Sequence, residues 1–471
     1  MKKTKIVATI SDLRCDPAFI RQLYEAGMDV ARLNTAHQSP ESSEQIVKNI
    51  RSVSDKIAIM IDTKGPELRT CKVKEEFTIA AQSEILVQGD PEAVSHPGCI
   101  YVKYHNFVNE VPVGSSILIE DGIIELYVKE KKDNALVCIA QNDGIIKSNK
   151  NINIPGVNLN LPTLNEKDKS YIDFAIKNDV DFIAHSFVRN KEDLLEIQKL
   201  LDEKQSKIKI IAKIENQQGV GNIDNILNHC YGVMVARGDL AVEIPYERIP
   251  IIQRELVQKC IEKRKPVIIA TQMLHSMINN PRPTRAEVTD VANAVYSQTD
   301  AIMLSNETAG GRYPILAVKT MARIAEEIEK HKEPYNDIKP VTLSSDISAF
   351  LTKSAVRGSI KLNAAAIIAD TETGRTIRNI AAFRGSKVVF ARCYDKRVMR
   401  ELSLSYGISA DYMEMKETTR DFIQESITTL LKEKKLSKDS LVVVVAGNFG
   451  THHGASFVEI STVENLTKVN K

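Results

Sequence analysis

Short apolar runs alternate with amphipathic stretches through the first two thirds of the chain. The runs carry Val and Ile at consecutive positions, which is typical of parallel strands buried on both faces. Most are followed by apolar residues at helical spacing. The predicted strands are residues 5–10, 30–33, 57–61, 182–188, 208–214, 232–235, 266–270 and 301–304, and the predicted helices include 17–26, 42–53, 191–203, 251–263, 285–296 and 314–330.

These eight units predict an α/β fold, a (β/α)8 TIM barrel made of residues 1–65 and 161–332. Residues 66–160 interrupt the barrel after its third strand. Alternating runs at 77–87, 116–120, 123–130 and 135–141, with turns at Asp121-Gly122 and Asp143-Gly144, predict an inserted small β-barrel domain. Because the insertion leaves the barrel where a strand ends, at the face that carries barrel active sites, we expect it to act as a lid.

A third domain is predicted for residues 341–471, after a linker at 331–334. Its apolar runs alternate with helical patterns, which indicates a separate C-terminal α/β domain. The predicted strands are 365–369, 387–391 and 441–445, and the predicted helices are 346–360, 375–383, 398–404 and 420–433.

Composition excludes several classes of protein. The 471 residues carry a net charge of +2, which gives no basic surface for nucleic acid. No apolar run approaches the roughly 18–20 residues of a membrane span. The start, MKKTKIVATISD, is read as a first strand because polar residues interrupt it too early for a signal peptide. Seven scattered cysteines without a CxxC motif predict free thiols, and we expect a cytoplasmic protein.

Polar residues gather where the predicted barrel strands end. A single one is most simply explained as a solvated strand end or a structural salt bridge. Seven strand ends that supply cations, carboxylates and hydroxyls toward one opening instead predict an active site. These residues are Arg32 and Asn34, then Asp62, Thr63 and Lys64, then Ser186, Lys213, Glu215, Arg237, Gly238, Asp239, Thr271, Gln272, Ser305 and Glu307.

The residue types at these strand ends point to phosphoryl transfer. Glu215 and Asp239 offer hard oxygen ligands for Mg²⁺ or Mn²⁺. Arg32 and Lys213 are cations suited to a phosphoryl group. Gly238 allows a ligand to approach backbone amides closely. This combination favours a reaction driven by positioning and charge neutralisation.

Eight local sequences, in order along the barrel, resemble the pyruvate kinase family. The inserted β domain and the C-terminal domain also fit that family's architecture. The resemblance implies transfer of a phosphoryl group from phosphoenolpyruvate to ADP, giving pyruvate and ATP in glycolysis. The matching segments are 4–10 (TKIVATI), 27–34 (GMDVARLN), 62–69 (DTKGPELR), 212–216 (AKIEN), 236–240 (ARGDL), 270–274 (ATQML), 282–295 (RPTRAEVTDVANAV) and 302–309 (IMLSNETA).

The resemblance assigns roles to matching positions. It implies that Glu215 and Asp239 bind the divalent metal, and that the Gly238 and Asp239 amides with the Thr271 hydroxyl hold the substrate carboxylate. Arg32 and Lys213 would bind the phosphoryl group, and Lys213 would neutralise charge during transfer. The remaining implied residues are Ser305, in a water network that protonates the enolate, and Arg69, Lys150 and His37, which contact the nucleotide.

A potassium site is also implied, with one departure. The family's potassium ligands match Asn34, Asp62 and Thr63, but Ala36 stands where the family commonly has a serine ligand. Thr35 does not replace that hydroxyl, because adjacent side chains of an extended segment point in opposite directions. Glu67 is nevertheless the residue type typical of potassium-dependent members. We therefore predict weakened K⁺ binding.

The third domain carries a candidate effector site where a strand leads into a helix. Hydroxyls and amides at a helix start can bind phosphate, and the family places an allosteric phosphorylated ligand at the matching loop. An ordinary capped helix beside a flexible turn at 447–455 is the alternative. Glu372 stands where some sugar-phosphate-responsive members have lysine, so the effector's identity stays open. The candidate residues are Thr371, Thr373, Gly374, Arg375 and Thr376.

Two other functions compete with the active kinase. One is a catalytically silent homologue that binds ligands, for which Ala36 is the support. The other is a metal-dependent barrel lyase acting on pyruvate-like acids, which needs no second phosphate site; Lys64, Arg69 and Lys150 favour the kinase. The resemblance further implies a homotetramer, with residues 282–295 near a subunit interface.

Overall fold

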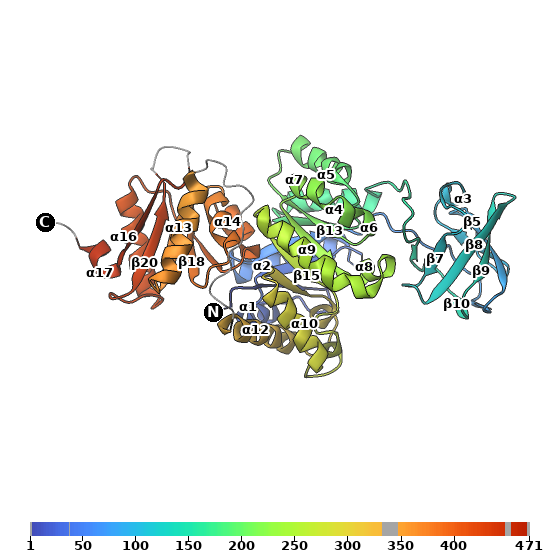
Figure 1. The fold of residues 1–471 in the computed structure, drawn as a ribbon, viewed down its shortest axis with the longest axis horizontal. Coiled ribbons are helices and arrows are strands. Elements are labelled where there is room, and N and C mark those ends of the chain that lie inside the picture. Colours follow the sequence, from blue (N-terminus) through green and yellow to red (C-terminus); the bar gives the residue numbers. More distant parts are fainter. Residues whose placement is uncertain (1, 37, 332–346, 448–453, 469–471) are drawn as a thin grey trace.

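Three bodies lie in a row along the long axis of the molecule (Figure 1). The computed structural model describes residues 2–36, 38–331, 347–447 and 454–468. A barrel surrounded by helices occupies the middle, an all-β body lies at one end and an α/β body at the other. No helix within these ranges is long and apolar enough to cross a membrane.

Among the described residues, eight parallel strands close into the predicted barrel, in the order β1-β16-β15-β14-β13-β12-β3-β2. Each predicted strand is confirmed to within a few residues. The largest difference is at the fourth, predicted to reach residue 188, which ends three residues earlier. The strands are β1 (Lys5–Thr9), β2 (Val30–Asn34), β3 (Ala58–Asp62), β12 (Phe182–His185), β13 (Lys209–Ile214), β14 (Gly232–Ala236), β15 (Val267–Ala270) and β16 (Ala301–Leu304).

Helices cover the outside of the barrel and begin at recognisable caps. Thr284 and Glu287 form a capping box at the start of α10, and Gly27 ends α1 in the left-handed region, at φ 118°. The helices are α1 (Pro17–Ala26), α2 (Pro40–Val53), α4 (Glu166–Lys177), α5 (Lys191–Glu203), α6 (Gln217–Gly221), α7 (Ile223–His229), α8 (Arg237–Glu243), α9 (Ile249–Glu262), α10 (Arg285–Tyr296), α11 (Asn306–Ala309) and α12 (Pro314–Lys330), with 3-10 turns η1 (Tyr246–Arg248) and η2 (His275–Ile278).

The barrel interior determines where the polar residues face. Apolar side chains on alternate strand positions fill the lumen as one buried cluster. Side chains of a strand point alternately into the lumen and away from it. The residue two positions after a lumen-facing apolar residue therefore also faces the lumen, at the carboxyl end of the strand. The lumen-facing pairs are Val30 and Arg32, Met60 and Asp62, Ile211 and Lys213, and Met303 and Ser305.

The inserted β domain is confirmed, but its strands differ from the predicted ones, and β6, β10 and β11 were not predicted. It contains a six-stranded sheet, ordered β11-β7-β8-β9-β5-β6, and a β10-β4 pair that share one hydrophobic core. The run 77–87 is not one strand, because a turn with Gln82 at φ 65° separates β4 from β5. Gly144 begins a strand instead of lying in a turn. The elements are β4 (Phe77–Ile79), β5 (Glu84–Gly89), β6 (Cys99–Val102), α3 (Phe107–Glu110), β7 (Ser116–Ile119), β8 (Ile124–Lys132), β9 (Ala135–Ala140), β10 (Gly144–Ile146) and β11 (Ile152–Asn153).

The C-terminal α/β domain is confirmed as well. As far as the chain is described, its sheet has the order β19-β18-β17-β20-β21, and β21 is antiparallel to β20. The sequence predicted β17, β18 and β20 but not β19 or β21. The elements are α13 (Ile347–Lys361), β17 (Ala366–Thr371), α14 (Arg375–Ala382), β18 (Val388–Cys393), α15 (Lys396–Glu401), η3 (Leu402–Leu404), β19 (Ile408–Tyr412), α16 (Thr419–Lys432), β20 (Leu441–Ala446), β21 (Phe457–Thr462) and α17 (Val463–Thr467).

Buried ion pairs join the C-terminal domain to the barrel. Arg384 donates two hydrogen bonds to Asp300, at 2.9 and 2.5 Å, and Arg400 donates to Asp181 at 2.5 Å. Asp300 and Asp181 directly precede barrel strands. The C-terminal domain therefore contacts the amino end of the barrel, opposite the strand ends that carry the predicted site.

Candidate functional site

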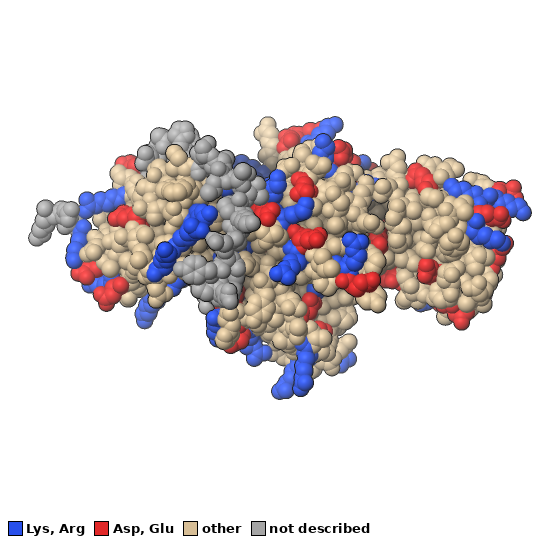
Figure 2. All heavy atoms as spheres, in the orientation of Figure 1, with Lys and Arg blue, Asp and Glu red and all other residues tan. Residues whose placement is uncertain are grey.

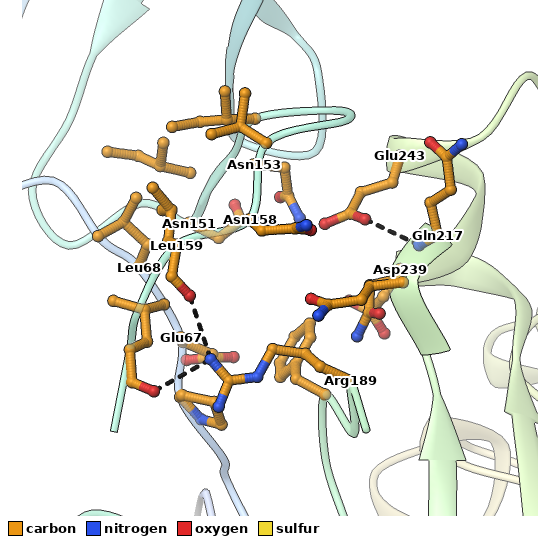
Figure 3. Close-up of a pocket in the computed structure, with 18 of the residues that line it drawn as sticks. Glu67, Leu68, Asn151, Asn153, Asn158, Leu159, Arg189, Gln217, Asp239 and Glu243 are labelled. Atoms are coloured by element: carbon orange, nitrogen blue, oxygen red, sulfur yellow. Dashed lines mark hydrogen bonds between the residues drawn. The ribbon is translucent and has the colours of Figure 1, made fainter. Parts of the chain in front are cut away.

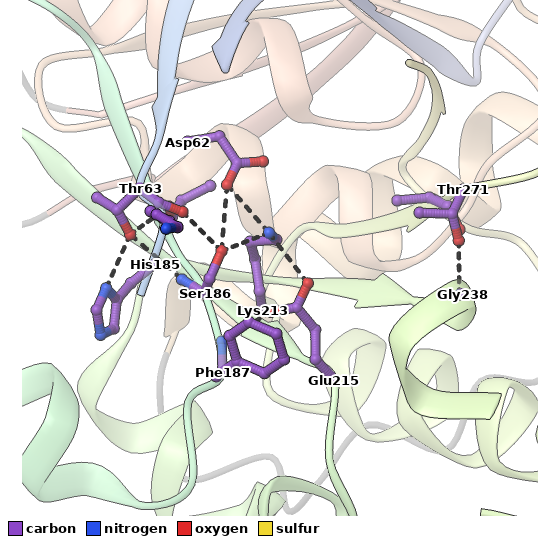
Figure 4. Close-up of polar contacts among 12 residues, drawn as sticks. Asp62, Thr63, His185, Ser186, Phe187, Lys213, Glu215, Gly238 and Thr271 are labelled. Carbon is purple, nitrogen blue, oxygen red and sulfur yellow. Dashed lines mark hydrogen bonds and ion pairs between the residues drawn. The ribbon is translucent and has the colours of Figure 1, made fainter. Parts of the chain in front are cut away.

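The Lys213 ammonium lies at the centre of a buried polar cluster (Figure 4). Its Nζ lies 3.0 Å from Asp62 Oδ1 and 3.0 Å from Glu215 Oε1, and it donates to Ser186 Oγ at 2.5 Å. Burial alone would lower the pKa of Lys213, but the two carboxylates outweigh burial and hold that pKa above its ordinary value. Lys213 is therefore a fixed positive charge at the end of the barrel lumen.

Arg32 lies beside Lys213 and shares its carboxylate. Arg32 Nε donates to Asp62 Oδ2 at 2.7 Å, and its Nη1 donates to Thr9 Oγ1 at 2.9 Å. Burial favours a raised pKa for Asp62, yet Arg32 and Lys213 bring the pKa below its ordinary value. Two cations thus converge on one buried carboxylate, and Asp62, Glu215 and Ser186 together engage the three donors of the Lys213 ammonium.

Glu215 and Asp239 form the candidate divalent-metal site. Burial raises the pKa of Glu215 to about 7; Lys213 opposes this, and Asp239 adds to it. Burial likewise raises the pKa of Asp239. A cation between the two carboxylates would offset the cost of burying their negative charges, and hard oxygen ligands suit Mg²⁺ or Mn²⁺. No group of three His, Cys, Asp or Glu residues suited to a metal occurs in the described chain. Two carboxylates are a usual protein contribution to a Mg²⁺ site, because this ion keeps several water ligands.

Gly238 and Thr271 lie next to each other, just beyond the ends of the neighbouring strands β14 and β15. The Gly238 N–H donates to Thr271 Oγ1 at 2.9 Å. Thr271 has φ 69°, a strained conformation for a β-branched residue, and Arg237 donates to its carbonyl at 2.8 Å. A side chain at position 238 would meet Thr271 only at ordinary contact distance, 3.5 Å, so the protein itself leaves this approach open. Such a hydroxyl and amide suit a carboxylate ligand.

Ser305 lies at the same end of the barrel, just after β16. Its N–H donates to Glu307 Oε2 at 2.8 Å. The other carboxylate oxygen of Glu307, which is buried, accepts from Leu274 N at 3.3 Å. Glu307 thereby fixes the turns that follow the last two barrel strands.

The predicted potassium ligands lie on two neighbouring strand ends, where Asn34 pairs with Asp62 in register. Asn34 Oδ1 accepts from Ala36 N at 3.1 Å. The Thr63 hydroxyl contacts His185 Nδ1 at 3.0 Å, and the Thr63 carbonyl accepts from Ser186 Oγ at 2.7 Å. The Thr35 hydroxyl donates to the Asp62 carbonyl at 2.8 Å.

The structure brings the predicted nucleotide residues Arg69 and Lys150 together in the inserted domain, on paired segments. Arg69 Nε donates to Glu67 Oε2 at 2.8 Å, and Lys150 Nζ donates to Glu120 Oε1 at 2.6 Å. His37, the third predicted residue, lies outside the described residues. Each described cation is already paired with a partly buried acid.

A cleft of about 330 Å³ separates the inserted domain from the barrel (Figure 3). The inserted domain and its linkers contribute Glu67 and Asn158, and the barrel contributes Arg189, Glu243 and Asp239. Lys213 does not line the cleft. The cleft therefore meets the polar cluster at one of the two candidate metal carboxylates.

The predicted effector loop joins β17 to α14. Thr371 Oγ1 accepts from Gly374 N at 2.8 Å, and Gly374 has φ 78°. β17 and β20 are neighbours in the sheet, and the strand order continues to β18 on one side of this pair and to β21 on the other. Such a reversal of strand order is the position where doubly wound sheets bind ligands. Of the turn predicted at 447–455, residues 448–453 lie outside the described residues.

Two supporting features could not be read from the sequence. After β12 the chain turns at Phe187, with φ 55°, so that its N–H donates to Glu215 Oε2 at 2.7 Å. Asp168 accepts from the N–H groups of Lys64 and Gly65 at 2.9 and 3.2 Å. These contacts join residues that are 28 or more positions apart, and no local pattern marks them.

Charges of both signs, lysines and arginines with acids, are mixed on the face that Figure 2 shows. The net charge of +2 agrees with this distribution.

Known proteins resemble the chain in both sequence and structure. The model of the pyruvate kinase barrel domain matches residues 1–318, and that of the pyruvate kinase alpha/beta domain matches residues 350–461. Pyruvate kinases of Borreliella burgdorferi and Bacillus licheniformis are 45% and 43% identical, each over 99% of this chain and over 98% and 81% of their own lengths. The crystal structure of a pyruvate kinase from Cryptosporidium parvum superposes with a TM-score of 0.93 at 35% identity, covering 98% of this chain and 96% of that one. The chain belongs to the pyruvate kinase family, whose members transfer a phosphoryl group from phosphoenolpyruvate to ADP.

Proposed function

We propose that this chain is an active member of its family in which Lys213 and Arg32 bind the phosphoryl group. The observation that carries the proposal is the position of Lys213, a charged ammonium held by Asp62 and Glu215 at the barrel mouth. Charge develops on the phosphoryl oxygens during transfer, and a preorganised cation stabilises it without reorganisation. Lys213 would supply that stabilisation, and Arg32 would orient the group.

We propose that Glu215 and Asp239 hold Mg²⁺ or Mn²⁺, which would supply charge stabilisation to the substrate oxygens. The Gly238 and Asp239 amides and the Thr271 hydroxyl would bind the substrate carboxylate. Their proximity at the barrel mouth supports this assignment. Ser305, at the neighbouring strand end, would order water for protonation of carbon.

We propose that the inserted domain closes over the nucleotide. Arg69 and Lys150 would bind its phosphates after leaving Glu67 and Glu120, with His37 as a further contact. Closure would exclude water that could otherwise accept the phosphoryl group. K⁺ would bind weakly beside Asn34, Asp62 and Thr63, since Ala36 supplies no hydroxyl.

The remaining parts of the proposal concern regulation and assembly. Thr371, Thr373, Gly374, Arg375 and Thr376 would bind a phosphorylated effector, which the neighbouring strand ends β17 and β20 support. The assembly would be a cytoplasmic homotetramer. The domain boundaries stay as we predicted them: 1–65 with 161–332, 66–160, and 341–471.

The test is pyruvate formation by the purified chain from phosphoenolpyruvate and ADP with Mg²⁺, with and without K⁺. Turnover that requires both substrates and the metal supports the proposal. If no effector in a panel of sugar phosphates and nucleoside monophosphates produces turnover, the silent homologue is favoured. Calorimetry would then measure whether that homologue binds ligands.

A further inference from the structure

The segment that returns from the inserted domain to the barrel is held by both bodies at once. Residues 157–162 contain neither helix nor strand. Within them, residues 159–161 form a returning tripeptide whose backbone groups are bonded alternately by the barrel and by the inserted domain. The two sets of bonds come from side chains 85 positions apart in sequence, Tyr104 and Arg189.

Arg189 binds the tripeptide from the barrel side. Its Nη1 donates to the Leu159 carbonyl at 3.2 Å and to the Leu161 carbonyl at 3.0 Å. Its Nε and Nη2 donate to Asp193 at 3.2 and 2.8 Å, and Thr163 also donates to Asp193, at 2.8 Å. The side chains of Asp193 and Arg189 are 5% and 17% exposed. The guanidinium is therefore fixed by a buried carboxylate before it meets the tripeptide.

Tyr104 and Glu110 bind the middle residue from the other side. Glu110 Oε2 accepts from the Asn160 N–H at 2.9 Å. The Tyr104 hydroxyl lies 2.7 Å from Glu110 Oε1 and 3.3 Å from the Asn160 carbonyl. Both side chains belong to the inserted domain. Within three residues, the side chains that bind the backbone thus come from the barrel, then from the inserted domain, and then from the barrel again.

The outgoing segment is held differently. The N–H groups of Lys64 and Gly65 donate to Asp168, and Asn165 Nδ2 donates to the Gly65 carbonyl at 3.4 Å. Asp168 and Asn165 belong to the start of α4, on the barrel. The described side-chain bonds to the backbone of these two outgoing residues therefore come from the barrel, whereas Glu67 of the inserted domain pairs with the side chain of Lys64.

We propose that the returning tripeptide is the pivot about which the inserted domain turns, and that Arg189 and Tyr104 are positioning residues that set its angle. This inference rests on the proposed function of the inserted domain as a closing lid. Leu159, Leu161 and Arg189 also line the cleft that contains Asp239, so rotation at the tripeptide changes the width of that cleft.

The two sides of the pivot differ in what they bind. Arg189 presents a planar, charged fork that a buried carboxylate holds in place, and it binds the carbonyls of Leu159 and Leu161. Glu110 and Tyr104 bind the N–H and the carbonyl of one residue, Asn160. The barrel therefore holds both ends of the tripeptide, and the inserted domain holds its middle. Lysine at 189 would keep the charge beside Asp193 but would lose the fork that reaches both carbonyls.

The variant Arg189→Lys tests the pivot, with Arg51→Lys as a matched control. Arg51 also binds a carbonyl, that of Ile57 at 2.6 Å, and an aspartate, Asp181 at 2.9 Å, and its side chain is 21% exposed. It lies at the opposite end of the barrel. Hydrogen–deuterium exchange of peptides covering residues 157–163 reports the tripeptide directly, and steady-state kinetics report its effect on catalysis.

We expect Arg189→Lys to speed exchange in this segment and to lower kcat/KM for ADP by about 10-fold to 100-fold, as for misplacement of a reacting group by about 1 Å. KM for phosphoenolpyruvate should stay unchanged, because its proposed contacts all lie on the barrel. Tyr104→Phe should speed exchange in the same peptides, and Arg51→Lys should alter neither readout.

Unchanged exchange in Arg189→Lys, or equal losses toward both substrates, would overturn the pivot. So would the same pattern in Arg51→Lys. If the wild-type chain makes no pyruvate at all, the proposed function fails, and the exchange measurement still decides whether Arg189 and Tyr104 hold the tripeptide.

Discussion

Replacing Lys213 with methionine removes one buried positive charge and keeps most of the side-chain volume. The ammonium is shared by Asp62, Glu215 and Ser186, all within 3.0 Å. Loss of one main transition-state charge costs roughly 4 kcal/mol, so we expect kcat to fall by about 1000-fold. Metal binding should be largely kept, because Glu215 and Asp239 remain.

The same variant has a pH signature in stability. Asp62 keeps Arg32, but Glu215 loses its ammonium partner, and its pKa, already raised to about 7, rises further. A carboxyl whose folded pKa is raised destabilises the fold fully above that pKa, and the penalty declines as pH falls toward the unfolded value. The variant should therefore lose more stability relative to wild type at about pH 8 than at about pH 6.

The assay is turnover at saturating phosphoenolpyruvate, ADP and Mg²⁺, combined with Mn²⁺ binding by electron paramagnetic resonance and denaturant unfolding at the two pH values. Lys209→Met is the control, since Lys209 lies on the same strand at its other end, 3.8 Å from Glu401. Near-normal turnover in Lys213→Met, or an equal loss in Lys209→Met, would refute the role given to Lys213.

Three further predictions test the ion and effector sites. Ala36→Ser should restore a potassium ligand and lower the half-activating K⁺ concentration; an unchanged K⁺ titration would count against the site. Mg²⁺ affinity measured by calorimetry should weaken below about pH 7, because Glu215, with a pKa of about 7, must lose its proton to bind the ion; constant affinity from acid to neutral pH contradicts this. Thr371→Val removes the acceptor of the Gly374 N–H and should abolish activation by phosphorylated metabolites without changing the unactivated rate; retained activation would exclude this loop.

The barrel could be predicted because its strands carry apolar residues on both faces, whereas its helices carry them on one face only. The luminal position of Asp62 and Lys213 follows from the same alternation, since each lies two residues beyond an apolar luminal side chain. Prediction failed where burial is incomplete. β21 is an edge strand with partly exposed residues along its whole length, and the turn at Gln82 divides a run that looks continuous in the sequence.

The supporting contacts could not be predicted because they join distant segments. Arg189 and the Leu159 carbonyl are 30 positions apart, and Tyr104 and Asn160 are 56 apart. Every residue has a backbone carbonyl, so the sequence does not indicate which carbonyls Arg189 binds. The resemblance to a family identified the residues proposed to touch substrates, and the structure was needed to find those that hold the chain around them.

The two groups of cations differ in what a ligand must displace. Lys213 and Arg32 are buried with Asp62, and breaking such pairs would cost several kcal/mol. Arg69 and Lys150 are about one-third exposed, and their pairs with acids of the inserted domain contribute little. A phosphate can therefore exchange with the second group at small cost, while the first keeps its geometry throughout. That difference suits a site in which the barrel fixes the reacting group and the lid releases a nucleotide after every turnover.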